Sequence, residues 1–216
     1  MKYNLVILIV IFLLILTTPF LLRYYKINKI DKFKDNINQI KYYNSNIQLN
    51  KKVIIDVLNN IKPESKVLIF GLGWDSKMWY NYHNNTYFVE NKDEYINLNK
   101  KDIPTENIIK FNYNNINVKN SCKASYDYLN NIKIPEKLKK IKYFDIIIID
   151  GPEGYSDDKP GRLIPFFWST KLSKKGTIIY ADDSSRKLES YCISKFYKSN
   201  NKILFPERNG CTKIFV

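Results

Sequence analysis

Acidic side chains follow two apolar segments of the sequence and are the residues best suited to acid–base or metal chemistry. Asp150 comes directly after the run 144–149 (FDIIII), and Asp182 and Asp183 follow the run 176–180. Continuous apolar runs of this length are typical of buried strands in a parallel sheet. Ligands of such sheets bind at the carboxyl ends of the strands. We therefore expect the three carboxylates to converge on one rim, as a general base, as ligands of Mg²⁺ or Mn²⁺, or as both.

A structural role for these carboxylates is also open on the sequence alone. Asp183 lies shortly before Arg186, where a helix is predicted to start, and Asp is a preferred N-cap residue. Asp182 could serve the same purpose, whereas Asp150 is less well placed for it. The single histidine, His83, argues against a Ser-His-Asp triad, and we expect it to be a surface residue after a helix.

A short glycine turn is a second candidate ligand-binding feature. Gly71 and Gly73 lie between a predicted strand at 66–70 and a predicted helix. Ser76 stands where a third glycine would complete G-x-G-x-x-G, which argues against a pyrophosphate-binding loop. Glu90 ends the next predicted strand and could accept hydrogen bonds from the ribose of an adenosine ligand. A tight turn without a ligand remains the alternative for the glycines alone.

The composition indicates one globular domain. The chain has 216 residues, of which 44% are hydrophobic, and a formal net charge of +14. Its lysines are spread over every segment, and its richness in Lys, Asn, Ile and Tyr fits a bias toward A- and T-rich codons. We therefore interpret the charge as solvated surface and do not expect nucleic acid as a partner. The three cysteines show no zinc-ligand spacing and are too few for a disulfide framework.

An apolar segment opens the chain. Residues 5–22 are apolar apart from two threonines and a proline, which is near the lower length limit for a membrane span. Bulky residues follow, without a small-residue cleavage site, so we expect residues 1–22 to be an uncleaved single-pass anchor rather than a signal peptide. Residues 23–50 are expected to form a stem with an entry helix, and residues 51–216 the enzyme domain.

Strand and helix patterns alternate along residues 51–216. Strands are predicted at 66–70, 86–89, 107–111, 144–149 and 176–180. Helices are predicted at 53–61, 75–82, 92–99, 135–140, 161–171 and 186–197. This alternation predicts an α/β fold with a mostly parallel sheet. Two last strands, 202–205 and 211–216, flank the turn signal Asn209-Gly210 and predict a C-terminal antiparallel hairpin, the usual ending of the Rossmann-like fold of methyltransferases that use S-adenosylmethionine (SAM).

Four segments of the chain carry specific motifs. They are FGLGWDSKMW (70–79), FVENKDEYI (88–96), DIIIIDGPEGYSDDKPGRLIPFFWS (145–169) and IIYADDSSRKLESY (178–191). In order and spacing they resemble the glucuronoxylan 4-O-methyltransferase family of polysaccharide-modifying enzymes over residues 66–216. The family pattern runs F-G-L-G-H-D-S, an acidic pair after the second strand, I-D-A-P-x-G-Y with P-G-R a few residues on, and H-D-x-x-R ahead of a helix.

The resemblance implies SAM as the methyl donor and a sugar hydroxyl of a glycan as the acceptor, with a glucuronic-acid-like residue as the first candidate. Cofactor contacts are implied for Gly71, Gly73, Asp75, Ser76, Glu90 and Asp150. Acceptor contacts are implied for Tyr155, Pro160, Gly161 and Arg162. Asp150 and Asp183 are the candidate catalytic residues, and together with Asp182 they are the candidate ligands of a divalent metal ion.

The chain departs from the family pattern at four positions. Trp74 replaces a histidine, Gly151 an alanine, Glu153 a basic residue and Asp182 a histidine. Glu153 would repel a uronic-acid carboxylate unless a metal ion or Arg162 offsets its charge. The methyl donor is therefore better supported than the acceptor sugar.

The resemblance also bears on location. Plant members of the family face the Golgi lumen, which implies a lumenal domain on a Golgi or secretory-pathway membrane. The basic residues that flank the anchor instead favour a cytosolic domain, so the orientation stays open.

Two other functions fit the same sequence. One is a metal-assisted O-methyltransferase that acts on a small phenolic or other acceptor. The other is a non-catalytic, membrane-tethered protein of polysaccharide assembly, against which the intact Gly71, Gly73 and Glu90 argue. The sequence does not give the oligomeric state.

Overall fold

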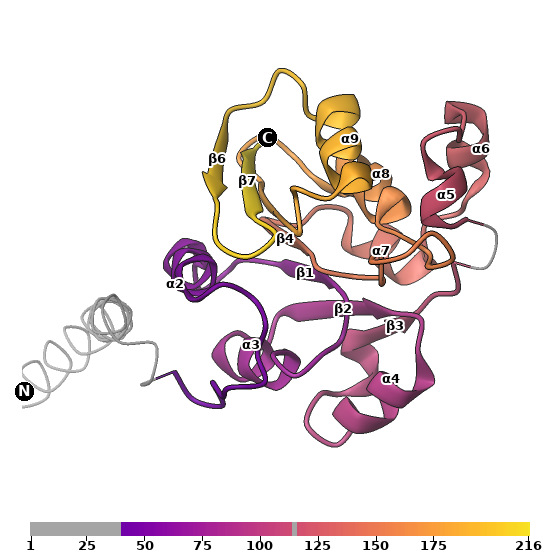
Figure 1. Cartoon of the computed structure of the whole chain (residues 1–216). Coiled ribbons are helices and arrows are strands. Elements are labelled where there is room, and N and C mark those ends of the chain that lie inside the picture. The colour runs from indigo at the N-terminus through magenta and orange to yellow at the C-terminus, as the bar shows by residue number, and fades with distance from the viewer. Residues whose placement is uncertain (1–39, 114–115) are drawn as a thin grey trace, which may run out of the picture. The chain divides into compact units, whose positions relative to one another are not determined.

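A computed structural model describes residues 40–113 and 116–216 of the chain. Lys41–Val216 form one compact unit, in which helices cover both faces of a central sheet (Figure 1). The predicted α/β fold is therefore confirmed. Ile47 and Leu49, which precede the predicted start of the enzyme domain at residue 51, are buried in this unit. Residues 41–50 form turns, and the predicted entry helix is not found among them.

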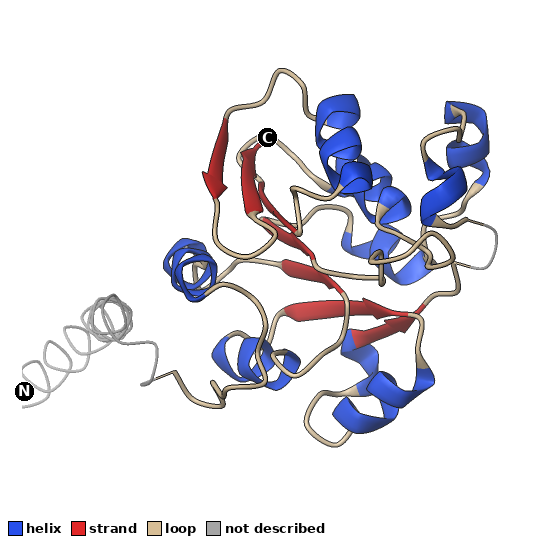
Figure 2. Cartoon of the chain, viewed as in Figure 1, coloured by secondary structure: helices blue, strands red, loops and turns tan. Residues whose placement is uncertain are grey.

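The sheet has seven strands in the order β3-β2-β1-β4-β5-β7-β6. Strands are drawn in red in Figure 2. Their bounds are β1 Val67–Phe70, β2 Thr86–Glu90, β3 Ile108–Lys110, β4 Ile146–Ile149, β5 Ile178–Asp182, β6 Lys202–Phe205 and β7 Cys211–Phe215. The first five strands are parallel, and β7 pairs antiparallel with both β5 and β6. This arrangement confirms the predicted C-terminal hairpin.

The helices agree with the sequence periodicity at their centres and differ by a few residues at their ends. Their bounds are α2 Lys51–Asn60, α3 Ser76–Tyr82, α4 Asp93–Asn99, α5 Val118–Ser121, α6 Tyr126–Asn131, α7 Glu136–Ile141, α8 Leu163–Leu172 and α9 Lys187–Phe196. Helices α5 and α6 were not predicted, because each is too short and polar to show a clear helical period. A short 3-10 helix, η2 (Thr105–Asn107), precedes β3.

The centre of the sheet is fully apolar. All residues of β1 and β4 are buried, as expected for strands covered on both faces. Helix α8 is apolar on nearly every side and packs into the same core, where Trp168 lies against Phe70 and Phe111. Full burial explains why these segments read as continuous apolar runs rather than as alternating patterns.

The register of the parallel strands decides where polar side chains can meet. Phe70 lies opposite Val89 on one side and Ile149 on the other, and Ile149 lies opposite Ala181. The residues that follow these positions therefore emerge at one edge of the sheet. The rim expected from the sequence is formed by this alignment.

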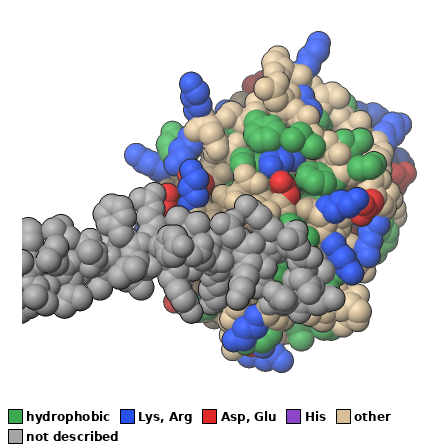
Figure 3. All heavy atoms as spheres, turned by 90° about the vertical axis from the view of Figure 1, so that its left-hand side faces the viewer, with side chains coloured by type: hydrophobic (Ala, Val, Ile, Leu, Met, Phe, Trp, Pro, Cys, Tyr) green, Lys and Arg blue, Asp and Glu red, His purple; other side chains and the backbone are tan. Residues whose placement is uncertain are grey.

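The predicted anchor, residues 1–22, and most of the predicted stem lie outside the described residues. Across 40–113 and 116–216, no helix combines the length and the apolar character that crossing a membrane requires. On the face of the molecule drawn in Figure 3, the Lys and Arg side chains lie at several separate places rather than in one continuous patch.

His83 corrects one prediction. It follows α3 as expected, but its side chain is buried, not on the surface. Its Nε2 atom lies 2.6 Å from the carbonyl oxygen of Ser65, so the ring links the end of α3 to the turn before β1. The sequence predicts exposure for His83 because it does not show that the turn before β1 packs over this residue.

Two glycines with left-handed backbones offer a matched test of the packing. A methyl group at Gly161 (φ +69°) would lie 2.5 Å from Leu188 Cδ2 and 3.0 Å from Val118 Cγ2, whereas one at Gly176 (φ +91°) would meet nothing within 4 Å. Both Gly→Ala variants strain the backbone, but only Gly161→Ala also overpacks the core. We expect it to lower the free energy of unfolding by about 1–3 kcal/mol more than Gly176→Ala, in urea titrations. Equal losses of unfolding free energy in the two variants would show that Val118 and Leu188 can move aside without cost.

Candidate active site

A cleft lies at the carboxyl ends of β1, β2, β4 and β5. Of the residues predicted for the site, it is lined by Gly71, Gly73, Asp75, Glu90, Asp150, Tyr155, Arg162, Asp182 and Asp183. Ser76, Pro160 and Gly161 do not line it. The structure thus brings together the glycine turn and the acidic rim, which are far apart in the sequence.

The glycine turn is held by its own side chains. Ser76 is buried, and its Oγ accepts a hydrogen bond from the backbone N–H of Gly73 at 2.8 Å. Trp79 Nε1 donates to Asp75 Oδ2 at 2.7 Å. Ser76 was predicted to contact the cofactor, but its geometry gives it a role in shaping the turn instead. Gly71 must be small because a methyl group there would lie 3.3 Å from the backbone nitrogen of Gly151.

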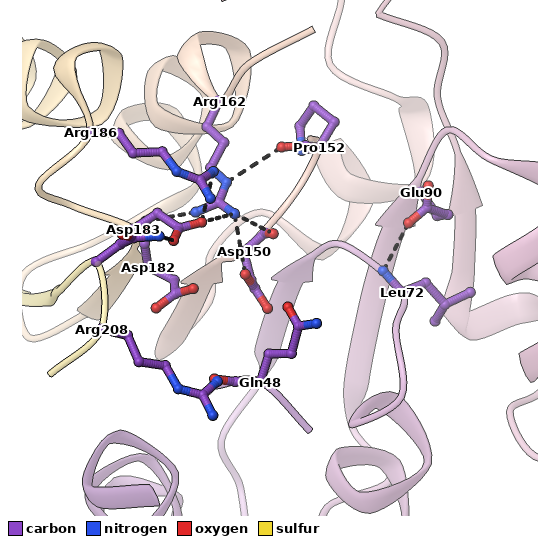
Figure 4. A network of polar contacts seen from close by, with 11 residues as sticks. Gln48, Leu72, Glu90, Asp150, Pro152, Arg162, Asp182, Asp183, Arg186 and Arg208 are labelled. Atoms are coloured by element: carbon purple, nitrogen blue, oxygen red, sulfur yellow. Dashed lines mark hydrogen bonds and ion pairs between the residues drawn. The ribbon is translucent and has the colours of Figure 1, made fainter. Parts of the chain in front are cut away.

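The carboxylate of Glu90 already accepts hydrogen bonds within the protein, which leaves it less able to bind a ligand than a free carboxylate would be. It is buried, and its Oε2 accepts a hydrogen bond from Leu72 N–H at 2.9 Å (Figure 4). Its Oε1 accepts from the N–H groups of Asn91 and Lys92, each at 2.7 Å. Burial raises the pKa of Glu90, and these three donors oppose the rise. Glu90 therefore fixes the glycine turn to β2 while it also faces the cleft.

A buried guanidinium organises the acidic rim. Arg162 Nη1 donates to the carbonyl of Asp182 at 2.7 Å, and Nη2 donates to the carbonyl of Asp150 at 2.8 Å (Figure 4). Nη2 also lies 2.8 Å from Asp183 Oδ2 and 3.3 Å from Asp150 Oδ1. Nε donates to the carbonyl of Pro152 at 3.4 Å. With its nitrogens used inside the protein, Arg162 is a positioning residue, and the predicted direct contact with the acceptor is not supported.

The three carboxylates lie close enough to influence one another. One oxygen from each of Asp150, Asp182 and Asp183 can be chosen so that all lie within 4.8 Å of one another. Burial raises the pKa of Asp150 well above its ordinary value; the charge of Asp182 adds to this and Arg162 opposes it. Burial likewise raises the pKa of Asp182. Oxygen ligands in this arrangement suit a hard divalent cation such as Mg²⁺.

The alternative that Asp183 caps a helix is wrong. Helix α9 has Arg186 at its N-cap position, and no side chain caps it there. The carboxylate of Asp183 instead accepts from Arg162, Arg186 and Asn209. Its backbone is left-handed (φ 53°), a conformation that costs a non-glycine residue roughly 1–2 kcal/mol. Strain of this kind persists where the surroundings fix a side chain in a required place.

Glu153 is neutralised within the protein. Its Oε1 lies 2.5 Å from Lys92 Nζ, and its Oε2 lies 3.8 Å from Lys159 Nζ. The acidic residue in place of the family's basic one is therefore balanced by two lysines. The expected repulsion of a uronic-acid carboxylate by Glu153 is accordingly reduced.

The segment predicted to lie beside the acceptor divides into two parts. Tyr155 lines the cleft and is 64% exposed, with Lys159 Nζ 5.4 Å from the centre of its ring. Gly161 is buried against Leu188 and Val118, which gives it a packing role.

Several cleft residues were not predicted. Trp74 is 54% exposed at the cleft, and residues 46–50, Arg186 and Arg208 also line it. The H-D-x-x-R motif could have indicated Arg186, which occupies its last position. Nothing in the sequence pattern indicates residues 46–50 or Arg208, because they reach the cleft only through the packing of distant loops.

Several curated plant proteins are similar in sequence to the chain. Arabinogalactan O-methyltransferase 2 of Arabidopsis thaliana is 28% identical over 178 residues, covering 70% of the chain and 60% of that protein. Protein IRX15-LIKE of the same plant is 26% identical, covering 70% and 56%. Glucuronoxylan 4-O-methyltransferase 2, also of A. thaliana, is 28% identical, covering 59% and 52%. These matches confirm the resemblance to the glucuronoxylan 4-O-methyltransferase family, although the chain spans only about six tenths or less of each relative.

No family model matches the chain, but a solved structure shares its fold. A crystal structure from Staphylococcus aureus, of a protein proposed to be a caffeoyl-CoA O-methyltransferase, aligns with a TM-score of 0.50 and 16% identity, covering 93% of the chain and 100% of that protein. At this identity the likeness shows the Rossmann-like methyltransferase fold and nothing further.

The buried guanidinium generates a stability prediction. Arg162→Met keeps a long apolar stem but leaves Asp150 and Asp183 without their buried cation. Removing one partner of a buried ionic network costs about 3–5 kcal/mol, so we expect a loss of this size in the free energy of unfolding at pH 7. The loss should shrink as the pH falls, because burial raises the pKa of Asp150 and its protonation removes the charge that is left unpaired. A loss below about 1 kcal/mol, the range of exposed pairs, would contradict the organising role of Arg162.

Proposed function

We propose that this protein transfers the methyl group of SAM to a sugar hydroxyl of a glycan. The observation that carries the proposal is the single cleft in which the glycine turn, Glu90 and the carboxylates of Asp150 and Asp183 meet. Such a cleft offers a place for a nucleoside ligand next to groups that can handle a proton. The methyltransferase fold and the relatives that modify arabinogalactan and glucuronoxylan support the same assignment.

The donor side of the cleft is suited to a cationic, phosphate-free nucleoside. Gly71 and Gly73 let the backbone approach a ligand closely, and Glu90 offers carboxylate oxygen toward a ribose. Asp75 and Asp150 add negative charge at the same place, which favours a sulfonium. When bound there, SAM would supply an electrophilic methyl group to an oxygen placed in line with it.

The acceptor side must align an oxygen and remove its proton. A sugar hydroxyl has a high pKa, so transfer requires a base close to it. Asp150 and Asp183 end neighbouring central strands and are held by Arg162, which fixes the direction of both carboxylates. The raised pKa of Asp150 makes its ionised form a stronger base than an ordinary aspartate.

A divalent cation fits the same carboxylates. Asp150, Asp182 and Asp183 would hold it, and when bound it would lower the pKa of a coordinated hydroxyl. Arg162 occupies one face of this group, so the cation would bind on the face that opens to the cleft. This role for the cation is part of the proposal.

The proposal includes a location. Residues 1–22 form an uncleaved membrane anchor, and the domain faces the lumen of the Golgi or another secretory compartment. The apolar character of residues 5–22 supports the anchor, and the lumenal side is what the resemblance to the plant family implies.

The central test compares Asp150→Asn and Asp183→Asn with the unaltered protein in a labelled-SAM assay on arabinogalactan, glucuronoxylan and a catechol. We expect transfer to a glycan, and a fall in kcat of at least about 100-fold in each variant, far larger than any loss of SAM affinity measured by calorimetry. The kcat/KM of the unaltered protein should fall as the pH drops through the raised pKa of Asp150, because the base must be ionised. The acid limb should lie above the ordinary aspartate pKa of about 3.9.

The controls separate the parts of this proposal. Lys139→Gln removes an exposed charge far from the cleft and should change nothing. A chelator should inhibit only if the cation takes part, and added Mg²⁺ should then restore the unaltered protein. Transfer to the catechol alone would refute the glycan acceptor, and full activity in both Asn variants would refute the base assignment.

The anchor has its own test. We expect mass spectrometry of the membrane-extracted protein to detect peptides from residues 1–22, and protease added to intact vesicles to leave the domain undigested. A mature N-terminus near residue 23 would refute the anchor, since a signal peptide is removed at such a site. Digestion of the domain in sealed vesicles would refute the lumenal orientation.

A further inference from the structure

The positive side chains of the cleft differ in how they are paired. Arg162 is buried between Asp150 and Asp183, and Arg186 lies 2.9 Å from Asp183 Oδ2. Arg208 is exposed and makes no ion pair with any residue of 40–113 or 116–216; its Nη1 donates to the backbone carbonyl of Gln48. Among the described residues that line the cleft, Arg208 is therefore the cation whose charge no carboxylate balances.

The turn that carries Arg208 is fixed to the acidic rim. Between β6 and β7, Asn209 Nδ2 donates to Asp183 Oδ1 at 2.9 Å, and its carbonyl accepts from Ser185 N–H at 3.0 Å. Ser184 N–H donates to the carbonyl of Gly210 at 3.0 Å. These bonds join the turn to the end of β5, so the position of Arg208 depends on the same residues as that of Asp183.

The backbone of Arg208 is held in an unfavourable conformation. Its φ of 56° is left-handed, as at Asp183. Glycine would adopt this conformation without strain, so the side chain is present at a cost to stability. Its neighbour Glu207 pairs with Lys52 at 2.5 Å and therefore does not neutralise it.

Arg208 and Arg162 lie on opposite sides of the carboxylates. Figure 4 shows the carboxylates of Asp150 and Asp182 pointing into the space between Arg162 on one side and Arg208 with Gln48 on the other. A ligand that enters this space would have the acidic rim on one side and an uncompensated guanidinium on the other. Guanidinium binds carboxylates in bidentate fashion and loses little hydration on doing so.

We propose that Arg208 binds the carboxylate of an acidic sugar in the acceptor and so directs a hydroxyl of that sugar toward Asp150 and Asp183. This inference rests on the proposed glycan methylation, for which the resemblance implies a glucuronic-acid-like acceptor, and it assigns to Arg208 the recognition of that sugar's carboxylate. Arg162 cannot serve in this role because its nitrogens are occupied within the protein. Glu153 does not prevent it, because Lys92 and Lys159 balance its charge.

The test uses glucuronoxylan and arabinogalactan, each in native form and with its uronic acids chemically reduced to neutral sugars. We expect the unaltered protein to prefer the native polymers. Arg208→Gln should lower kcat/KM on the native polymers by about 10- to 100-fold, the value of one hydrogen bond to a charged group, and change it little on the reduced ones. Arg208→Lys should recover part of the loss, and SAM affinity should not change.

Lys202→Gln is the matched control, because it removes the same charge from an exposed side chain of β6 that lies outside the cleft lining. If Arg208→Gln folds poorly, Arg208→Gly gives the same comparison with a relaxed backbone. Equal losses on native and reduced polymers, or no loss, would overturn the assignment and leave the methyltransferase proposal intact. Absence of transfer to every polymer by the unaltered protein would overturn both.

Discussion

The guanidinium of Arg162, buried where β4 and β5 end, holds the rim of the cleft together. It joins the carbonyls of Asp150 and Asp182, at the carboxyl ends of the two strands, to the carboxylates of Asp150 and Asp183. A charge in this position is stable only while its partners surround it, because the desolvation of an unpaired ion costs several kcal/mol. The arginine directly precedes α8, whose apolar surface lies in the core, so the rim is tied to the centre of the fold. The carboxylates of Asp150 and Asp183 are therefore oriented by a residue at the start of α8, a helix that is packed in the core.

Contacts between distant segments extend this order across the cleft. Lys92, after β2, pairs with Glu153 in the loop after β4, which joins the proposed donor side to the proposed acceptor side. Asn209 joins the C-terminal hairpin to Asp183. These two contacts explain why an acidic residue is tolerated at position 153 and how the C-terminal hairpin takes part in the cleft. The acidic residue at position 153 is paired with a lysine that follows a different strand. The hairpin supplies a wall of the cleft as well as two strands of the sheet.

The electrostatics of the cleft differ from those of the whole molecule. The chain carries a net charge of +14, yet the rim gathers carboxylates whose pKa values burial raises. The excess of lysine lies elsewhere on the surface, where it is solvated. Net charge therefore informs on the surface of this protein, while the chemistry of the cleft follows from a small set of buried groups.

Much of the fold could be predicted because its signals are local. The apolar runs before Glu90 and Asp150 mark buried strands by their length, and the glycine turn and the hairpin turn carry their own residue signatures. Parallel strands end at a common edge, so the convergence of Asp150, Asp182 and Asp183 follows from the strand assignment alone. The sequence also carried the resemblance to polysaccharide methyltransferases, because the motifs lie in that order around these same turns.

What the sequence could not decide was which groups remain free. Polar side chains that could contact a ligand instead form hydrogen bonds within the protein, as at Arg162, Ser76 and Glu90. Arg208 carries no motif and reaches the cleft only because a hairpin packs beside β5. Burial and partner geometry depend on contacts between residues far apart in the chain, which no local pattern records. Residue type and strand order set the chemistry available to this protein, and tertiary packing decided which side chains are left to perform it.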